Sequence, residues 1–186
     1  MSGGYIHLKN INGERFAEVR NNDGESYVMF KSLATYRDRP ASAKGIPAGI
    51  NTENLMGMAV RLKISGGEET QMSALDVYVD GSRTSNAASA PLKFIDKATG
   101  TISDVTYNSG IRITGEVDGW LIIPFEAYPA AKGKSWFIEN YSTLQIWQHE
   151  SACSHGCSQS SWDNKTMYIG DTFFIENMNT FAAART

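Results

Sequence analysis

The amino-acid sequence predicts an all-β protein, built as an antiparallel sandwich of two sheets. Three observations lead to this fold class. Short segments alternate apolar and polar residues with a period of two, which is the pattern of a strand with one buried face. Turn residues separate these segments, and the chain contains 17 glycines. No segment shows a capped helical stripe, apart from one short turn near residues 32–36.

About nine or ten short strands are expected, a number typical of a sandwich or barrel rather than of a fold that alternates strands and helices. The segments that hold them span residues 5–11, 25–33, 56–67, 73–82, 90–110, 111–128, 142–150 and 166–177. The stretch 34–57 is rich in Pro, Gly, Ala and Asn, and it is expected to form a long irregular connection.

Two segments show the alternation most clearly. In residues 58–64, Arg61 falls opposite a set of apolar positions, and in residues 75–80 the same is true of Asp76 and Tyr78. One side-chain set of such a strand fills the core and the other faces water. The apolar sets are therefore expected to point inward and the polar sets outward.

Length and composition are those of one globular domain, expected to span residues 1–186. The chain is 41% hydrophobic and 20% charged, which is ordinary for a soluble protein. The net charge of -3 argues against a nucleic-acid partner, because such proteins usually carry a basic face. No apolar run reaches about 18 residues, so no membrane partner is expected.

The ends of the sequence look like the edges of a fragment of a larger, multi-modular protein. The start "MSGGYIHLKN" lacks the basic and apolar regions of a signal peptide, and the end reads "AAART". Any export signal is then expected to lie outside this sequence. A lone cysteine pair in a β domain favours a secreted, extracellular location.

Aromatic and polar residues occupy the outward positions of several strands. If these strands share a sheet, one exposed face carries Arg61, Asp76, Tyr78, Gln145, Trp147 and His149. Aromatic rings stack on the apolar face of a sugar, while amides and charged groups bind paired hydroxyls. Such a face would bind a polysaccharide without a nucleophile or a cofactor, with Trp147 as the stacking platform.

Each of these assignments has an alternative. A strand tryptophan is most often a core residue, which is the interpretation favoured for Trp120, whereas Trp147 is better placed for a ligand. Trp162, in the loop "SQSSWDN", is either a ligand contact at the rim or a plug that fills the loop. Arg61 and Asp76 can equally belong to a solvated face.

Three phrases in the C-terminal half occur in a recognisable order. They are "GWLIIPF" at 119–125, "LQIWQ" at 144–148 and "YIGDTFFIEN" at 168–177. This order resembles jelly-roll carbohydrate-binding modules of bacterial plant-cell-wall-degrading enzymes and cellulosomal proteins. The resemblance implies a jelly-roll sandwich and a non-catalytic module that holds an enzyme or a cell surface against a β-glucan or a hemicellulose. The last phrase departs from the family pattern, because Gly170 stands where an Asp is frequent.

The same resemblance implies a structural calcium, since many such modules hold one near the chain ends with carboxylate and carbonyl ligands. Asp171 and Glu14 are the candidate ligands here. The alternative is that both are ordinary surface carboxylates. No other cofactor is expected.

An enzyme on the same fold is the first alternative function. Laminarinase-type glycosidases place two carboxylates about 5 Å apart from a Glu-x-Asp-x-x-Glu strand, and this phrase is absent. A polysaccharide lyase needs a base and a cation that neutralises a uronate, roles that His149, Tyr78 and Arg61 can fill. The second alternative is an adhesin-like domain whose aromatic face meets another protein.

Both cysteines lie in one stretch, "HESACSHGCSQSSW". Cys153, Cys157, His149 and His155 would supply four zinc ligands, but four ligands from one short loop would be strained. The Cys-x-x-Cys spacing of redox sites is absent. A disulfide between Cys153 and Cys157 that stiffens the loop is favoured, with zinc and free thiols as alternatives.

Overall fold

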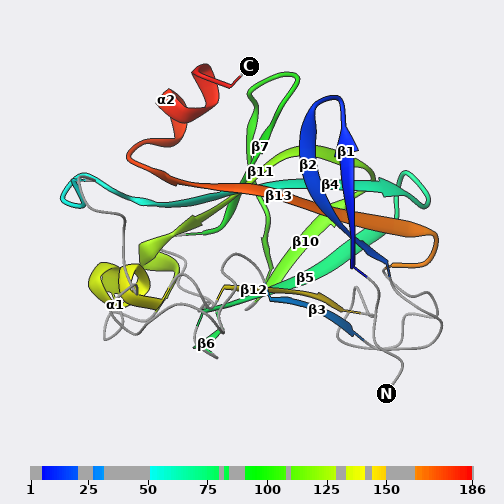
Figure 1. Ribbon diagram of the computed structural model, residues 1–186, viewed down its shortest axis with the longest axis horizontal. Helices are drawn as coiled ribbons and strands as arrows, with labels where there is room; N and C mark the ends of the chain where they lie inside the picture. Colours follow the sequence, from blue (N-terminus) through cyan, green and yellow to red (C-terminus); the bar gives the residue numbers. More distant parts are fainter. Residues whose placement is uncertain are drawn as a thin grey trace.

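The computed structural model describes residues 6–20, 27–31, 51–79, 82–83, 91–107, 110–128, 133–140, 144–149 and 162–185. Over these residues the chain is an all-β antiparallel sandwich of two sheets, which confirms the predicted fold class (Figure 1). Neither described helix has the length and apolar character needed to cross a membrane.

The larger sheet has seven strands in the order β1-β2-β13-β4-β11-β7-β8. Their bounds are β1 Ile6–Ile11, β2 Glu14–Arg20, β13 Lys165–Ile175, β4 Gly57–Gly66, β11 Val117–Pro124, β7 Lys93–Asp96 and β8 Ile102–Asp104. The described strands of this sheet pair antiparallel throughout, and the central strand β4 pairs with β13 on one side and β11 on the other.

The smaller sheet has six strands, with the order β3-β12-β5-β10-β9 and β6 paired to β5. Their bounds are β3 Tyr27–Lys31, β12 Gln145–His149, β5 Met72–Val79, β10 Gly110–Thr114, β9 Thr106–Tyr107 and β6 Ser82–Arg83. Figure 1 shows β3, β12 and β5 below the larger sheet, with the C-terminal helix on the far side of the larger sheet.

The main core lies between the two sheets and contains the predicted inward sets. The buried side chains of β4 and β5 in this core are Met58, Val60, Leu62, Ile64, Leu75, Val77 and Val79. The prediction of inward and outward faces for these two strands is confirmed. The outward residues of β4 and those of β5 therefore lie on opposite sides of the sandwich.

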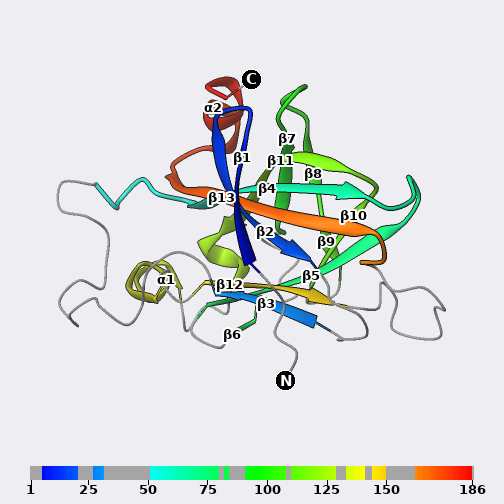
Figure 2. The same cartoon turned by 45° about the vertical axis from the view of Figure 1, so that its right-hand side comes forward.

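A second, smaller core lies on the outer face of the larger sheet, under helix α2 (Met178–Ala183) (Figure 2). Trp120 of β11 is buried there, 4% exposed, and meets Phe181 of α2 edge-on with the ring centroids 5.4 Å apart. Asn177 caps the helix, because its side chain accepts hydrogen bonds from the backbone N–H groups of Asn179 and Thr180. The core assignment for Trp120 is thus confirmed.

Four elements were not predicted: strand β2, the 3₁₀ helix η2 (Phe125–Ala127) and helices α1 (Gly133–Asn140) and α2. Helices α1 and α2 have eight and six residues, too short to show a repeating apolar stripe, and they depend on packing for stability. Trp136 and Phe137 of α1 contact Tyr128, with ring centroids 5.3 Å and 5.5 Å away. The expected turn near residues 32–36, and almost all of the expected connection at 34–57, lie outside the described residues.

Strand β13 contains an irregularity that matters for the site below. Its register with β4 shifts between Ile169 and Thr172, so Gly170 and Asp171 fall within a bulge. A β-bulge bends its strand and redirects a side chain.

Candidate functional site

The outer face of the smaller sheet brings Gln145 and Tyr78 together. Gln145 of β12 pairs with Tyr78 of β5, and Tyr78 pairs in turn with Arg83 of β6. Gln145 and Tyr78 are half-buried, and Arg83 is exposed. The register therefore forms a row of an amide, a phenol ring and a guanidinium across three strands, which we call the Gln145–Tyr78–Arg83 row.

Asp76 lies beneath this row rather than on the surface. Its side chain is 1% exposed and forms an ion pair with the Arg83 guanidinium, so the expectation of an exposed Asp76 is wrong. Gly110 of β10 leaves room for it, because a Cβ there would lie only 2.5 Å from Asp76 Oδ1. Partial burial, followed by the charge and hydrogen bond of Asp76, raises the pKa of Tyr78 above its ordinary value. Asp76 thus orients Tyr78 and Arg83.

Trp147 and His149 are placed by the backbone of β12. Trp147 pairs with Asp76, and His149 pairs with Ala74. Both stand at alternate positions from Gln145, which is the spacing of residues on one face of a strand. Their side chains lie outside the described part of the chain, so stacking by Trp147 stays a prediction.

Arg61 does not belong to this face. It lies on β4 of the larger sheet, whereas Tyr78 and Trp147 lie on β5 and β12 of the smaller sheet. The prediction of one shared face is wrong, because the consecutive strands β4 and β5 enter different sheets. It follows that Arg61 is not brought together with His149 and Tyr78, the trio named for a lyase.

Trp162 is a plug and not a rim contact. Its side chain is 2% exposed within the main core, and Nε1 donates a hydrogen bond to the Ala74 carbonyl oxygen at 2.9 Å. The expectation of a ligand contact at the rim is therefore wrong. Burial of the ring with its single N–H satisfied explains the position.

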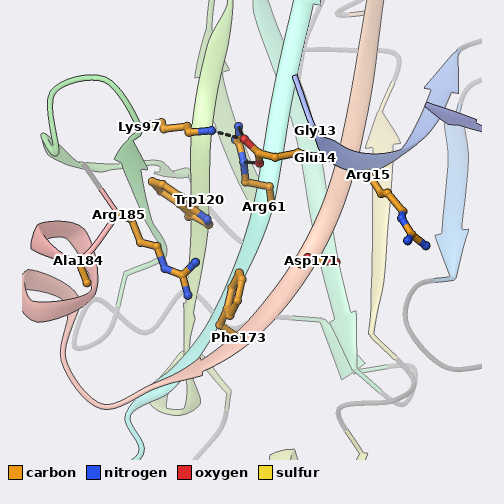
Figure 3. Close-up of a pocket in the computed structure, with 10 residues that line it drawn as sticks. All are labelled: Gly13, Glu14, Arg15, Arg61, Lys97, Trp120, Asp171, Phe173, Ala184 and Arg185. Atoms are coloured by element: carbon orange, nitrogen blue, oxygen red, sulfur yellow. Dashed lines mark hydrogen bonds and ion pairs between the residues drawn. The ribbon is translucent and has the colours of Figure 1, made fainter. Parts of the chain in front are cut away.

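A pocket of about 590 Å³ opens on the outer face of the larger sheet, beside α2 (Figure 3). It is lined by Gly13, Glu14, Arg15, Arg61, Lys97, Trp120, Asp171, Phe173, Ala184 and Arg185. This pocket and the Gln145–Tyr78–Arg83 row lie on opposite sides of the sandwich.

Arg61 is the centre of an ion-pair network along one wall of the pocket. Its Nε donates to Glu14 Oε2 at 2.6 Å, and its Nη2 lies 2.5 Å from Asp118 Oδ1. Its Nη1 donates to the Gly119 carbonyl oxygen at 2.8 Å. The side chain is only 5% exposed, so the alternative of a solvated face is also wrong for Arg61. Buried charge of this kind requires such pairing.

Packing holds the same guanidinium in place. It lies over the Phe16 and Trp120 rings, 5.2 Å and 5.3 Å from their centroids. A Cβ at Gly170 would lie 3.0 Å from Arg61 Cγ and 3.2 Å from the Arg15 carbonyl oxygen. Glycine in the bulge therefore gives the Arg61 side chain its space.

Glu14 is held in its charged form by two cations. The hydrogen bond from Arg61, together with the one from Lys97, lowers its pKa to about 2 although partial burial opposes the shift. Glu14 and Asp171 line the same pocket, as a shared calcium site would need. However, Arg61 and Lys97 repel a cation at Glu14, and no group of three His, Cys, Asp or Glu side chains exists among the described residues. The geometry does not favour calcium at this position.

The cysteine region cannot be assigned from the structure, because Cys153, Cys157 and His155 lie outside the described residues. The disulfide and the zinc alternative both stay predictions.

Comparison with known proteins identifies no relative: no family model matches the chain, and no curated protein or solved structure is significantly similar to it. The two outer faces of the sandwich are therefore the features from which a function can be inferred.

Sequence reasoning missed several residues of the pocket. Lys97 follows β7 in a turn, and Phe173 and Arg185 lie on β13 and just after α2. None of these positions carries a motif. The one signal in the sequence was the outward position of Arg61, which identified a charged residue on an outer face without indicating its partners.

Proposed function

We propose that the chain is a secreted, non-catalytic module that binds a plant cell-wall polysaccharide, a β-glucan or a hemicellulose, on the outer face of the smaller sheet. Trp147 and Tyr78 would provide rings for stacking on sugar rings. Gln145 and Arg83 would bind hydroxyls at the edges of those rings, with Asp76 holding Arg83 and Tyr78 in place.

The strand order supports a jelly-roll connectivity for this module. When β1, β7 and β8 are set aside, the larger sheet has the order β2-β13-β4-β11. When β6 and β9 are set aside, the smaller sheet has the order β3-β12-β5-β10. Along the chain these eight strands change sheet at every step except from β5 to β10, which are paired neighbours in the smaller sheet. That interleaving is the pattern of two Greek keys folded into a double-sheet jelly roll.

The single observation that carries the binding proposal is the Gln145–Tyr78–Arg83 row. The three residues come from three neighbouring strands, and Tyr78 and Arg83 are oriented by the same buried carboxylate. A fixed ring flanked by an amide and a guanidinium matches a sugar, which offers an apolar face and paired hydroxyls. No nucleophile or metal is needed for this role.

The expected affinity is modest. Each ring contributes about 0.5–1.5 kcal/mol beyond the burial of its area. A few rings together with hydrogen bonds then correspond to dissociation constants of about micromolar to millimolar.

Affinity electrophoresis on soluble β-glucans, xylans, mannans and pectins tests the proposal. At least one glycan should retard the wild type, and Trp147→Ala or Tyr78→Ala should remove the retardation while thermal unfolding shows a folded protein. Lys134→Gln, a change on helix α1, is the control, and the glycan should retard it as much as the wild type, each relative to its own migration without glycan.

Two outcomes would contradict the proposal. One is the absence of retardation by every glycan, which would favour a protein partner. The other is release of shorter sugars from the retarding glycan, which would indicate an enzyme.

A further inference from the structure

We propose that the pocket on the larger sheet is a second binding site, which takes an organic carboxylate, with Arg185 as its binding group. The pocket lies on the opposite side of the sandwich from the Gln145–Tyr78–Arg83 row. The inference therefore goes beyond the proposed function, and it does not depend on polysaccharide binding at the smaller sheet.

Cations outnumber carboxylates around the pocket. The charged residues of its lining are Arg15, Arg61, Lys97 and Arg185 on one side of the balance and Glu14 and Asp171 on the other. Lys63 and Asp118 add one charge of each sign, because both belong to the ion-pair network of Arg61. The surroundings of the pocket are therefore positive overall, which attracts an anion.

The cations of the network are already engaged with carboxylates. Arg61 is bound to Glu14 and Asp118, and it is only 5% exposed. Lys97 is bound to Glu14, and Lys63 Nζ lies 3.7 Å from Asp118. These three cations face two carboxylates, so the network adds positive charge to the pocket without offering a free guanidinium.

Arg185 is the cation that faces the pocket without such a partner. Its guanidinium lies over the Phe173 ring, 4.2 Å from its centroid, and 5.4 Å from that of Phe181. It has no carboxylate partner among the residues that the structure describes. Figure 3 shows this guanidinium directed into the space between Trp120 and Phe173, whereas Arg15 points away from both rings, on the β2 side of β13. Arg185 is therefore the group that meets a ligand.

A carboxylate is the anion that this arrangement fits. A guanidinium is a planar fork of N–H donors, which binds the two oxygens of a carboxylate through two parallel hydrogen bonds. The contact with Phe173 restrains that fork, which reduces the entropy lost on binding. Asp171, exposed on the bulge of β13, also lines the pocket and opposes a second negative charge on the ligand. A monoanion is therefore favoured over a phosphate or another dianion.

The size and walls of the pocket favour an organic ligand over a bare anion. The volume of about 590 Å³ lies within the range of small-molecule pockets, about 300–1,000 Å³. Phe173 and Trp120 supply apolar surface beside Arg185. A ring that carries the carboxylate, in a sugar acid or an aromatic acid, can fill this space while its charge meets the guanidinium.

The test is a titration of ¹⁵N-labelled protein at neutral pH and constant ionic strength, followed by the indole signal of Trp120. The ligands are glucuronate, benzoate, acetate, inorganic phosphate, sulfate and glucose, which is the neutral counterpart of glucuronate. Glucuronate or benzoate should shift the signal saturably, with a dissociation constant of about millimolar. Acetate and glucose should bind about tenfold more weakly, because acetate lacks the ring and glucose lacks the charge.

Variants at two positions test the charges of the pocket. Arg185→Gln should weaken binding of the better carboxylate about tenfold, because charge-assisted hydrogen bonds are lost. Arg185→Lys should recover only part of that affinity, since it keeps the charge but not the fork. Asp171→Asn should instead strengthen binding about twofold, because a like charge is removed.

The matched controls are Lys93→Gln and Asp163→Asn, which remove the same charges outside the pocket and should bind like the wild type. The ¹⁵N spectrum of each variant shows whether it is folded. Tyr78→Ala should also bind the carboxylate like the wild type. Failure of glycan binding at the smaller sheet and failure of this pocket are thereby distinguishable.

The proposal is overturned if no carboxylate shifts the Trp120 signal, or if phosphate, sulfate or glucose binds tighter than both ring carboxylates. It is also overturned if Arg185→Gln binds like the wild type or if Asp171→Asn binds more weakly. Tighter binding of glucuronate than of benzoate supports a sugar acid as the ligand, and the reverse order supports an aromatic acid.

Discussion

The two outer faces of the sandwich hold their charges in different ways. On the larger sheet, Arg61 is 5% exposed and receives partners from β2 and β11. On the smaller sheet, Asp76 is paired with Arg83, which is itself 40% exposed. A charged residue at an outward strand position is thus structural when several strands enclose it. When its partner remains in contact with water, the charged residue instead orients side chains of an exposed surface.

The largest expected effect is removal of the Arg61 charge. Arg61→Met should lower the free energy of unfolding by about 3 kcal/mol or more, because several charge-assisted hydrogen bonds are lost and Glu14 and Asp118 each lose one of their two cations. Urea denaturation measures the change. Lys63→Met is the matched control, because Lys63 lies on β4 like Arg61 and is less buried than Arg61. Its Nζ lies 3.7 Å from Asp118 of β11. Equal costs for the two variants would contradict the special position of Arg61.

On the smaller sheet the corresponding change is Arg83→Met. It should cost about 1–3 kcal/mol, because Asp76 is left buried without its cation. The double variant Arg83→Met/Asp76→Asn should recover part of that loss, since the buried charge is then gone. Urea denaturation of the single and double variants gives the coupling. A single variant as stable as the wild type would show that Asp76 does not need Arg83.

Acid should lower the free energy of unfolding mainly through Glu14 of the larger sheet. The pKa of Glu14 is about 2 in the folded protein, below its ordinary value of 4.5, so the unfolded chain takes up this proton first as the pH falls. The stability that Glu14 contributes is therefore complete above pH 4.5 and is lost as the pH falls toward 2. Glu14→Gln should flatten this part of the profile of unfolding free energy against pH, while the exposed control Glu126→Gln should not. An unchanged slope in Glu14→Gln would argue against the network.

Alkali should lower the free energy of unfolding, by a smaller amount, through Tyr78 of the smaller sheet. The pKa of Tyr78 is raised above its ordinary value of 10.0, so the unfolded chain loses this proton first. The stability from the protonated phenol is present below pH 10.0 and is lost as the pH rises through the higher folded value. Tyr78→Phe should reduce the alkaline loss of unfolding free energy, and Tyr168→Phe is the control. Identical alkaline profiles for wild type and Tyr78→Phe would contradict the raised pKa of Tyr78, which comes first from its partial burial and then from the Asp76 charge.

Part of the candidate site was predictable because strand alternation is a local property. The period of two assigned Arg61 outward and Met58 and Val60 inward, and the structure agrees. The same pattern identified Gln145 and Tyr78 as outward residues, which the register then placed opposite one another. Sheet membership was not predictable in this way, because β4 and β5 follow one another along the chain but pair with distant strands.

Residues outside regular strands show the same limit. Trp162 follows a stretch of sequence without a period of two, so no pattern distinguishes a buried ring from an exposed one, and the buried ring donates to the Ala74 carbonyl of β5. Helix α2 is too short for a recognisable stripe, although it covers Trp120 and closes one side of the pocket. No single segment of the sequence therefore predicts the pocket.

The sequence by itself determined the all-β class, the inward faces of β4 and β5 and the outward positions of Tyr78 and Gln145, because these follow from the alternation of neighbouring side chains, whereas Arg83 was not predicted. The tertiary structure decided which outward residues meet. In it, Arg61 lies on the other side of the sandwich from Tyr78, and Trp162 is buried. Arg61 and Glu14, which are 47 positions apart, contact each other in the wall of one pocket. Contacts of that kind depend on strand pairing across the whole chain, which no local pattern records.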